Sequence, residues 1–382
     1  MSVARPPMRI LHVVTGGFSG ATQVAIELVR AAHAKAPGSA MLALRRKRQT
    51  ELARVEALRA EGLPVELVAG WSHLATVLSV ARIARRWRPD VLVAHGFSDH
   101  LWGRFAGLLA GVPRLAHVEH NSRERYTAWR RWQTRWLARR TALIVGVSEG
   151  VRQSLLALGM PADRTIAIPN GTRLERFADA PAHPYAGRVP GIVMAARFAS
   201  QKDHATLLRA LALLRERGRR PPLLLAGGGS ARHERSARAL CTRLGLDDQV
   251  RFLGHRPDLP ELLMGHQLAV LSSHYEGMPL SLVEAMAAGC AVVGSAVPGI
   301  REMLVDGEDG RLVPHEDATA LADVLEQLLA DPGAAGAMAG RGRARALAEF
   351  TMGRMLARYE QAFAALPDRA ALRARSPAAA GR

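Results

Sequence analysis

The sequence predicts an α/β protein made of two successive Rossmann-like halves, each a parallel sheet with helices on both faces. Short runs rich in apolar and β-branched residues alternate with longer helical segments almost throughout. The alternation is interrupted once, at residues 172–189, which show no clear period and several closely spaced turn-forming residues. At ~150 residues per domain, 382 residues are enough for two or three domains.

The expected elements follow one another in the same order in both halves. The first half has helical segments such as 21–34 and 73–87, between strands expected at residues 8–14, 39–44, 64–68, 91–95, 115–119, 143–147 and 165–168. The second half has strands expected at residues 191–196, 223–226, 249–253, 268–272, 291–294 and 311–313. The carboxyl ends of both sets of strands should meet at one cleft, where open α/β sheets bind ligands.

These elements define a predicted division of the chain. We expect an N-terminal Rossmann-like domain over residues 1–172, a linker over 173–189 and a C-terminal Rossmann-like domain over 190–349. The tail at 367–382 is rich in Ala, Arg and Pro without an apolar period, which predicts disorder.

Composition and charge limit the class of protein. Apolar residues make up 48% of the chain, which is typical of a soluble globular protein and excludes wholesale disorder. Two cysteines, Cys241 and Cys290, cannot form a disulfide framework and fit a reducing compartment. The N-terminus reads as a first strand rather than a signal peptide, and no apolar run approaches ~18 residues. We therefore expect a cytoplasmic protein.

The positive charge is the unusual quantity. Fifty-two Lys and Arg stand against 34 Asp and Glu, which gives a net charge of +18. Such a charge favours polyanions: nucleic acid, anionic lipid head groups or phosphorylated substrates. Only three of the cations are lysines, so Lys202 is more informative than any single arginine.

A glycine-rich turn, TGGFSGATQ, follows the first strand. Gly16, Gly17 and Gly20 would let the backbone approach a ligand at the start of the next helix, where anions are favoured. The spacing is not G-x-G-x-x-G, and the second strand ends in arginines rather than the acid that holds an NAD ribose. NAD is therefore disfavoured, NADP is left open, and a tight turn without a ligand is the alternative.

Two cations lie where the second half begins. Arg197 follows the first strand of this half, and Lys202 stands five residues later, where the next helix starts. Two cations beside a helix N-terminus suit a diphosphate and could neutralise it as it leaves.

The segment SSHYEGMPLSLVEAMAAGC carries the strongest pattern. Glu276 lies in the loop after a buried strand, and Glu284 follows about one helical turn after Pro279, among apolar neighbours. Two carboxylates eight residues apart can flank a ligand. A solvated helix face could also carry Glu284, but a buried carboxylate needs a partner, for which a ligand hydroxyl is a candidate.

These motifs together resemble glycosyltransferase family 4, the retaining, sugar-nucleotide-dependent enzymes of the GT-B fold. The resemblance runs over nearly all of residues 8–366. It is most specific at the E-x7-E segment from Glu276 to Glu284 and the AMAAGCAVVGS and DGEDGRLV runs that follow. It also includes Arg197 with Lys202, IPNG at 168–171 and FLGHRPDLPELL.

The resemblance implies a role for each site residue. Arg197 and Lys202 would bind the donor diphosphate, Glu284 the nucleotide ribose, and Glu276 would lie near the transferred sugar. The remaining donor contacts would come from Gly16, Gly17, Gly254, Arg256, Gly277, Met278, Pro279 and Leu280. His120 is similar to the family's histidine near the reacting sugar, which would make it catalytic together with Glu276, Arg197 and Lys202. The alternative for His120 is a cap for the helix that follows. A helix at 350–366 would pack back toward the N-terminal half.

The resemblance also implies retention by front-face attack, with the leaving phosphate helping to deprotonate the acceptor. Asp-x-Asp does not occur in the chain, so two cations and helix N-termini are the expected counter-charge, without a metal or cofactor. Two departures from the family pattern, His266-Gln267 before a strand and Pro298 before Gly299, affect loop shape rather than chemistry.

Residues 123–140, RERYTAWRRWQTRWLARR, predict the acceptor side. The tryptophans are spaced for one helical face and are flanked by arginines: Trp129, Trp132, Trp136, Arg130, Arg131, Arg135, Arg139 and Arg140. Such a helix suits a membrane interface or an anionic lipid-linked acceptor. A core-facing tryptophan stripe with a basic back is the alternative. The segment 45–48 adds further cations to this half.

The expected function is transfer of a sugar from a nucleotide-diphosphate sugar to a lipid-linked, lipopolysaccharide or other cell-surface polysaccharide acceptor at the inner face of the membrane. Expected partners are the nucleotide sugar, this acceptor and an anionic membrane surface, with no specific nucleic acid. Two alternatives stay open: a nucleotide-sugar epimerase of the same fold, and a basic nucleic-acid-binding protein, although no recognition module accompanies the charge.

Overall fold

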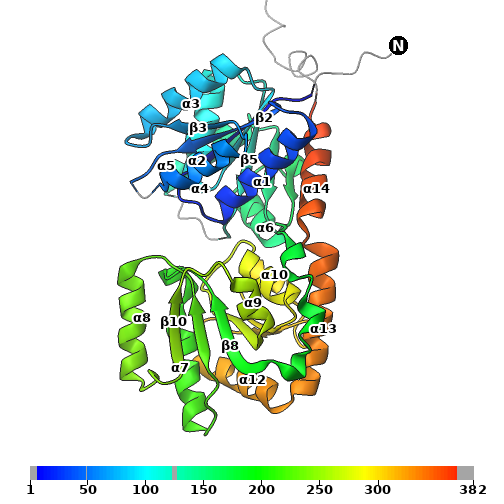
Figure 1. The fold of residues 1–382 in the computed structure, drawn as a ribbon. Coiled ribbons are helices and arrows are strands. Elements are labelled where there is room, and N and C mark those ends of the chain that lie inside the picture. The colour runs from blue at the N-terminus through cyan, green and yellow to red at the C-terminus, as the bar shows by residue number, and fades with distance from the viewer. Residues whose placement is uncertain (1–6, 49, 123–126, 368–382) are drawn as a thin grey trace, which may run out of the picture. The chain divides into compact units, whose positions relative to one another are not determined.

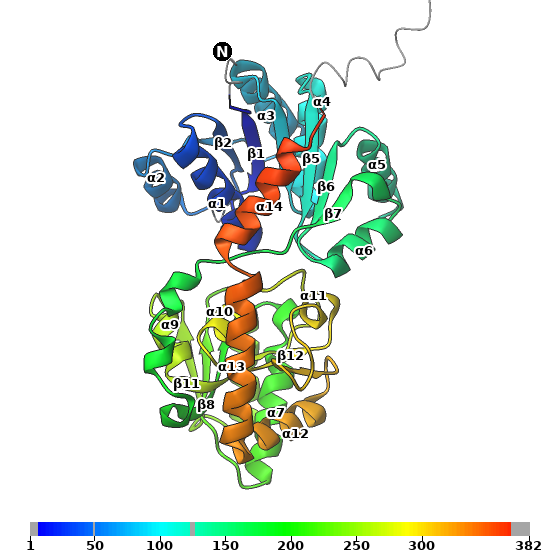
Figure 2. The same ribbon diagram turned by 90° about the vertical axis from the view of Figure 1, so that its right-hand side faces the viewer.

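The computed structural model describes residues 7–48, 50–122 and 127–367. The chain divides into two compact units (Figures 1 and 2). Unit 1 comprises Met1–Pro169 together with Leu356–Arg382, and unit 2 comprises Asn170–Met355. The tail predicted to be disordered lies outside the described residues except for Pro367.

Unit 1 contains a seven-stranded, wholly parallel sheet with the strand order β3-β2-β1-β4-β5-β6-β7. Its strands are β1 (Ile10–Thr15), β2 (Ala40–Arg45), β3 (Val65–Val68), β4 (Val91–His95), β5 (Arg114–Glu119), β6 (Leu143–Gly146) and β7 (Thr165–Ala167). Its helices are α1 (Gly20–Lys35), α2 (Leu52–Ala60), α3 (His73–Trp87), α4 (Phe97–Leu109), α5 (Ala128–Ala138) and α6 (Glu149–Ala157).

Alternate residues of β1 pack on opposite faces of this sheet, as expected of a strand covered on both sides. Leu11 and Val13 belong to the core cluster that includes residues of α3 and α4. Val14 belongs to the cluster that includes residues of α1 and α2. Figure 2 shows the corresponding layers of helices around the sheet. The core therefore consists of two apolar layers with the sheet between them.

Unit 2 contains a six-stranded parallel sheet with the order β10-β9-β8-β11-β12-β13. Its strands are β8 (Val189–Ala195), β9 (Leu223–Ala226), β10 (Val250–Gly254), β11 (His266–Leu271), β12 (Ala291–Ser295) and β13 (Arg311–Val313). Its helices are α7 (His204–Glu216), α8 (Ala231–Arg243), α9 (Leu259–Met264), α10 (Leu280–Ala287), α11 (Pro298–Arg301), α12 (Ala318–Ala330) and α13 (Pro332–Glu349). The predicted fold class, two parallel α/β sheets, is confirmed.

The last helix, α14 (Met352–Ala364), begins in unit 2 and continues into unit 1. Within unit 1, Phe363 lies edge-on to His12 at 6.5 Å between ring centroids. The part of α14 that belongs to unit 1 therefore packs against β1.

Several predicted boundaries are wrong by one to three residues. The predicted strand at 191–196 begins at Val189, inside the predicted linker, because Val189 pairs with His266. For the same reason His266 and Gln267 open β11 instead of preceding it. The rest of the predicted linker is not without structure. It contains the 3-10 helices Leu174–Phe177, Ala180–Ala182 and Tyr185–Gly187, and the Arg188 side chain donates to the carbonyl oxygens of His183 and Gly289 at 2.9 and 2.8 Å.

Candidate functional site

In unit 2, the loop between β11 and α10 places Glu276 in a buried position. A glycine supports this loop from behind: a Cβ on Gly299 would come within 2.2 Å of the Gly277 carbonyl oxygen and 2.5 Å of that of Glu276. Only glycine lets the short helix α11 approach so closely. Pro298 is the first residue of α11, a position where proline is favoured, so this departure from the family pattern fits the local structure.

Glu276 is paired with the lysine that the sequence singled out. Lys202 Nζ lies 2.5 Å from Glu276 Oε1, and both side chains are largely buried. Gln201 reinforces the contact by donating to the Tyr275 carbonyl oxygen at 2.8 Å and to Glu276 Oε2 at 3.4 Å. A buried carboxylate next to a buried ammonium satisfies both charges in the ligand-free protein. The structure thus brings together two residues that are 74 positions apart.

Arg197 lies just after β8 and is exposed. It makes no ion pair or side-chain hydrogen bond with the residues that the structure describes, so its guanidinium is available to an anion. The neighbouring backbone is fixed: the Ala196 amide donates to the Ala226 carbonyl oxygen at 2.9 Å, and the Phe198 amide to that of Gly228 at 2.7 Å.

The partner of this segment is a glycine run, Gly227–Gly229, that the sequence analysis did not single out. A Cβ on Gly227 would lie 2.1 Å from the Ala196 carbonyl oxygen, and one on Gly229 would lie 2.7 Å from the Phe198 backbone. Gly228 has open space around it. The run directly after a predicted strand was the signal available in the sequence. These glycines allow the loop with Arg197 to lie against the loop after β9.

Gly254 and Arg256 occupy the loop after β10. Gly254 has φ +65 and its carbonyl oxygen accepts a hydrogen bond from Gly227 at 2.8 Å, so it belongs to the same backbone arrangement. Arg256 is exposed and pairs with Asp258 through two hydrogen bonds, which raise the pKa of the guanidinium. Its charge is engaged locally, so a donor-binding role for Arg256 stays a prediction.

Glu284 lies on α10 with its side chain 15% exposed, and burial raises the pKa of this carboxyl. Its charged partner is Arg176, whose Nη1 lies 3.6 Å from Glu284 Oε1 and opposes that rise. Arg176 comes from the 3-10 helix Leu174–Phe177, where sequence periodicity gave no signal. The solvated-face alternative for Glu284 is therefore wrong.

The four residues after Glu276 connect it to α10. Gly277, Met278 and Pro279 are buried, and Leu280 begins α10 with Pro279 as its N-cap. The Met278 sulfur accepts a hydrogen bond from the Asn170 amide at 2.9 Å, which ties IPNG to this loop.

In unit 1, the two glycines after β1 differ. Gly16 is buried, and a Cβ there would lie 2.5 Å from Thr50 Oγ1 and 2.6 Å from the Arg45 carbonyl oxygen. Gly17 is exposed with open space around it. Gly16 is therefore required by packing, which agrees with the tight-turn alternative, while Gly17 leaves room for a ligand. Arg45 is buried, so it does not add to the basic surface as predicted.

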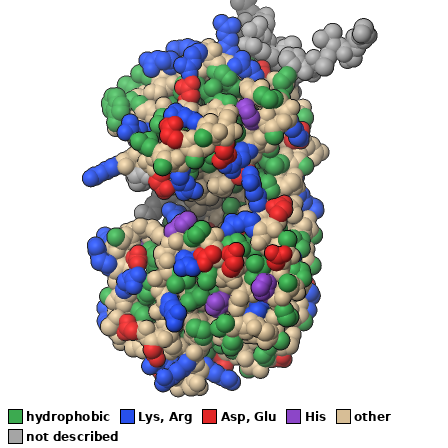
Figure 3. Space-filling view, in the orientation of Figure 1, with side chains coloured by type: hydrophobic (Ala, Val, Ile, Leu, Met, Phe, Trp, Pro, Cys, Tyr) green, Lys and Arg blue, Asp and Glu red, His purple; other side chains and the backbone are tan. Residues whose placement is uncertain are grey.

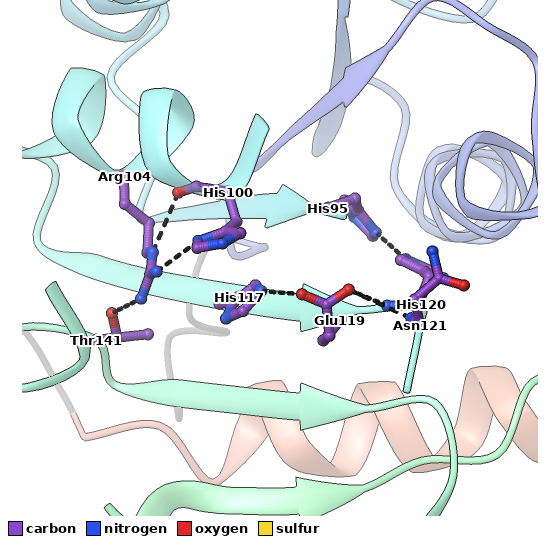
Figure 4. Close-up of polar contacts among 8 residues, drawn as sticks. All are labelled: His95, His100, Arg104, His117, Glu119, His120, Asn121 and Thr141. Atoms are coloured by element: carbon purple, nitrogen blue, oxygen red, sulfur yellow. Dashed lines mark hydrogen bonds and ion pairs between the residues drawn. The ribbon is translucent and has the colours of Figure 1, made fainter. Parts of the chain in front are cut away.

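His120 follows β5 and is half-buried. Its Nε2 lies 3.3 Å from His95 Nδ1, and its amide donates to Glu119 Oε1 at 2.8 Å, with Asn121 donating to the same oxygen at 3.3 Å (Figure 4). The alternative that His120 caps the next helix is wrong, because Thr127 is the N-cap of α5 and accepts from the Arg130 amide.

A cluster of buried polar side chains lies near His120, on the other side of Glu119 (Figure 4). His117 Nε2 is 3.4 Å from Glu119 Oε2, and the His117 ring stacks on His100 at 4.2 Å. Arg104 donates to His100 Nδ1 at 2.6 Å and to Thr141 Oγ1 at 3.0 Å. His100, His117 and Glu119 are close enough to hold a metal ion. However, the Arg104 charge opposes a cation, and Arg104 occupies one nitrogen of His100.

Helix α5 places its tryptophans in two environments. Trp129 and Trp132 are 64% and 55% exposed and stack on each other at 4.9 Å, whereas Trp136 is half-buried, 6.0 Å from Phe105 and under Arg140. The residues of α5 that face the core are Thr134, Leu137 and Ala138. The core-facing alternative is therefore wrong for Trp129 and Trp132. Residues 123–126 lie outside the described part of the chain.

Among the described residues, no helix is both long and apolar enough to cross a membrane. The space-filling view shows apolar and basic side chains interspersed over unit 1 on the side seen in Figure 3.

Comparison with known proteins agrees with this architecture. The family "Glycosyltransferase Family 4" matches residues 18–176, and "Glycosyl transferases group 1" matches residues 177–345. Lipopolysaccharide core biosynthesis glycosyltransferase LpsE of Rhizobium meliloti is 27% identical over 292 residues, which are 76% of this chain and 80% of LpsE. Glycogen synthase of Mycobacterium tuberculosis is 29% identical over 289 residues, 70% of this chain and 66% of that protein.

Solved structures share the fold. The crystal structure of Anabaena Alr3699/HepE in complex with UDP and glucose superposes with a TM-score of 0.81 at 22% identity and covers 94% of this chain and 100% of HepE. The two family matches adjoin each other and together span residues 18–345. The chain therefore belongs to the family 4 glycosyltransferases and has the GT-B fold.

Proposed function

We propose that this glycosyltransferase moves a hexose, with retention of anomeric configuration, from a nucleotide-diphosphate sugar to a lipid-linked or lipopolysaccharide-type acceptor. The observation that carries the donor half of this proposal is the Lys202–Glu276 pair, to which the exposed Arg197, five residues before Lys202, adds a second cation. A diphosphate would compete with Glu276 for Lys202 and would find a second, exposed cation in Arg197.

The charges define the proposed chemistry. When the anomeric bond breaks, the sugar becomes oxocarbenium-like and the nucleotide diphosphate leaves with the bonding electrons. We expect Arg197 and Lys202 to stabilise that negative charge. An oxygen of the leaving phosphate takes the proton of the acceptor hydroxyl, whose oxygen then forms the new bond on the same face of the sugar. Two cations supply the counter-charge, so we expect transfer to be independent of an added metal.

Further residues would hold the donor. Glu284, on the same loop–helix segment as Glu276, is proposed to accept hydrogen bonds from the ribose hydroxyls. The carboxylate is the better acceptor, and Arg176 favours that ionised form. HepE, which is similar in fold, was solved with UDP and with UDP-glucose, which makes UDP the first nucleotide to test.

Thermal unfolding with a nucleotide panel tests the donor site. A ligand that binds the native state raises the midpoint by mass action. We expect one of UDP, GDP or ADP, and the corresponding sugar nucleotide, to raise it in a buffer without metal, and Glu284→Ala to abolish the rise. If none of the three shifts the midpoint, or only NADPH does, the proposed donor site is wrong. Formation of an isomerised sugar nucleotide without acceptor would favour the epimerase instead.

The acceptor proposal rests on the uneven distribution of charge. Unit 1 carries 30 Lys and Arg against 13 Asp and Glu, a net charge of +17, whereas unit 2 carries 22 against 21. Helices α3 and α5 contain no acidic residue at all. Trp71, two residues before α3, and Leu74 in its first turn are strongly exposed, as are Trp129 and Trp132 on α5. Exposed tryptophans among arginines suit the interface of an anionic membrane.

The aromatic side chains between α3 and α5 form a continuous row. His73 stacks on Trp102 at 4.2 Å, Trp102 lies 6.3 Å from Phe105, and Phe105 lies 6.0 Å from Trp136. These contacts join α3, α4 and α5 along one packed row. Arg82, Arg131 and Arg139 make no ion pair among the residues that the structure describes. We propose that this face of unit 1 rests on an anionic membrane that carries the acceptor, as the relationship to LpsE supports.

Sedimentation with lipid vesicles tests this proposal. The double variant Trp129→Ala/Trp132→Ala should lose about 10-fold or more in binding to vesicles of phosphatidylglycerol and phosphatidylcholine. Leu347→Ala, which removes an exposed apolar side chain of unit 2, is the matched control and should bind as the wild type does. Equal vesicle binding by both variants would contradict the proposal that this face of unit 1 binds the membrane. Transfer to a soluble glucan but not to lipid-linked acceptors would favour the acceptor class of glycogen synthase.

A further inference from the structure

Three histidine rings form a row in unit 1, and only the last of them, His120, is a predicted catalytic residue. His12 on β1, His95 at the end of β4 and His120 directly after β5 come from three neighbouring strands. His12 Nδ1 lies 3.0 Å from His95 Nε2, and His95 Nδ1 lies 3.3 Å from His120 Nε2. His12 and His95 are each 1% exposed, and His120 is half-buried. The row therefore leads from the core to His120.

All three rings are neutral at neutral pH. Burial lowers the pKa of His12 to about 3 and that of His120 to about 4. Burial, followed by the neighbouring rings, lowers the pKa of His95 well below its ordinary value. A neutral imidazole has one N–H donor and one acceptor nitrogen, so each contact in the row needs one ring to donate and the other to accept.

Because His95 takes part in both contacts, the two hydrogen bonds are coupled. If His95 donates from Nδ1 to His120, its Nε2 must accept from His12, and all three rings carry their proton on Nδ1. If the direction reverses, all three carry it on Nε2. Either way His120 Nε2 is engaged inside the protein, which leaves Nδ1 as its outward nitrogen. The reversal changes no net charge and so avoids the cost of a buried cation.

We propose that His95, held by His12, is a positioning residue that orients the His120 ring and sets the tautomer in which Nδ1 meets a substrate hydroxyl. This inference rests on the proposed sugar transfer and on the predicted catalytic role of His120 in it. With the protons on Nε2, His120 Nδ1 accepts a hydrogen bond from the hydroxyl, and with the protons on Nδ1 it donates one. A hydroxyl, which can both donate and accept, matches either tautomer, whereas an ionised phosphate oxygen only accepts and matches one.

The backbone around His120 is fixed independently. Glu119 Oε1 accepts hydrogen bonds from the amides of His120 and Asn121, and Glu119 Oε2 faces His117 (Figure 4). The carboxylate therefore holds the main chain, while the imidazole row holds the ring. Which nitrogen of a histidine carries the proton is determined by the hydrogen bond at the other nitrogen, and here that bond is made by His95.

Nitrogen NMR of the full-length protein labelled with ¹⁵N-histidine tests the row without any substrate. The chemical shifts of the two ring nitrogens distinguish the tautomers, and signals are assigned with the variants His12→Phe and His120→Phe. We expect His12, His95 and His120 to share one tautomer at pH 7. Different tautomers among the three, or a charged ring at pH 7, would overturn the proposal.

Two amide substitutions at His95, which differ in side-chain length, test its effect on transfer. An asparagine amide reaches roughly the position of Nδ1, which faces His120, and a glutamine amide roughly that of Nε2, which faces His12. We expect kcat/KM of His95→Gln to fall about 10-fold or more below that of His95→Asn, because only asparagine keeps a partner for His120. Equal losses would show a purely structural role. A wild-type protein that transfers no sugar would contradict the proposed function. The NMR experiment would still show whether the three histidines share one tautomer.

Discussion

The two units share an architecture but differ in the ionisable groups of their candidate sites. In unit 1, burial lowers the pKa of five histidines and so favours their neutral form: His12, His95, His100, His117 and His120. Unit 2 instead keeps charged partners together, as in Lys202–Glu276 and Arg176–Glu284. Neutral imidazoles suit contacts with hydroxyls, and paired charges suit a diphosphate that can replace one partner. The same fold can therefore offer two kinds of binding chemistry.

Acid should destabilise unit 1 more than unit 2, and this difference in stability is the largest effect we expect. A histidine with a lowered folded pKa takes up its proton in the unfolded chain first, so stability falls as pH drops below about 6.5. For a folded pKa of about 4 or less, the loss between pH 7 and pH 5 is about 2 kcal/mol for each group. Unit 1 has several such groups, whereas His204 is the one histidine of unit 2 for which a lowered pKa is resolved among the described residues.

The measurement is simple because all six tryptophans, at positions 71, 87, 102, 129, 132 and 136, belong to unit 1. Urea unfolding followed by tryptophan fluorescence reports that unit, and circular dichroism reports both. We expect the fluorescence midpoint to fall more than the circular dichroism midpoint between pH 7 and pH 5. His95→Phe, which removes one neutral ring, should reduce this pH dependence. Coincident midpoints at both pH values would contradict the comparison.

The charged pair of unit 2 should dominate activity. Lys202→Ala removes one of two cations that face the proposed leaving group, and loss of such a group costs about 100- to 1000-fold in rate. Arg209→Ala removes an exposed cation of α7 and is the matched control. Steady-state kinetics should show the loss in kcat for Lys202→Ala, with the Arg209 variant close to the wild type. A rise in KM with kcat unchanged would mean that Lys202 binds the donor without stabilising the transition state.

The sequence predicted the strands well because both sheets are parallel and covered on both faces, so each strand appears as a continuous apolar run. It also predicted that Lys202 and Glu276 belong to one site. It could not predict Arg176 or the imidazole row. Arg176 sits in a 3-10 helix without periodicity, and His12 and His95 are lone histidines inside strands. Such residues acquire meaning only when strand order brings them together.

Two glycines of unit 2 should respond in opposite directions to substitution by alanine, with smaller effects on stability. Gly299→Ala would force a Cβ against the Gly277 carbonyl oxygen, and such overpacking costs about 1–3 kcal/mol. Gly340→Ala lies in α13 with open space around it and should stabilise by up to about 1 kcal/mol through helix propensity. Urea unfolding followed by circular dichroism measures both. Donor affinity should fall only in Gly299→Ala, because that change moves the loop with Glu276.

Arg176 should have the smallest effect, and it acts through a pKa. Its charge lowers the pKa of the Glu284 carboxyl against the effect of burial, so Arg176→Ala should let that pKa rise further. If the ionised carboxylate binds the ribose, donor affinity falls only a few-fold at neutral pH, but the acid limb of binding moves to higher pH. Glu284→Gln should be weak at every pH and lose this limb. Titration calorimetry across pH 5–8 distinguishes the two. An unchanged limb in Arg176→Ala would show that Glu284 does not control donor binding through its charge.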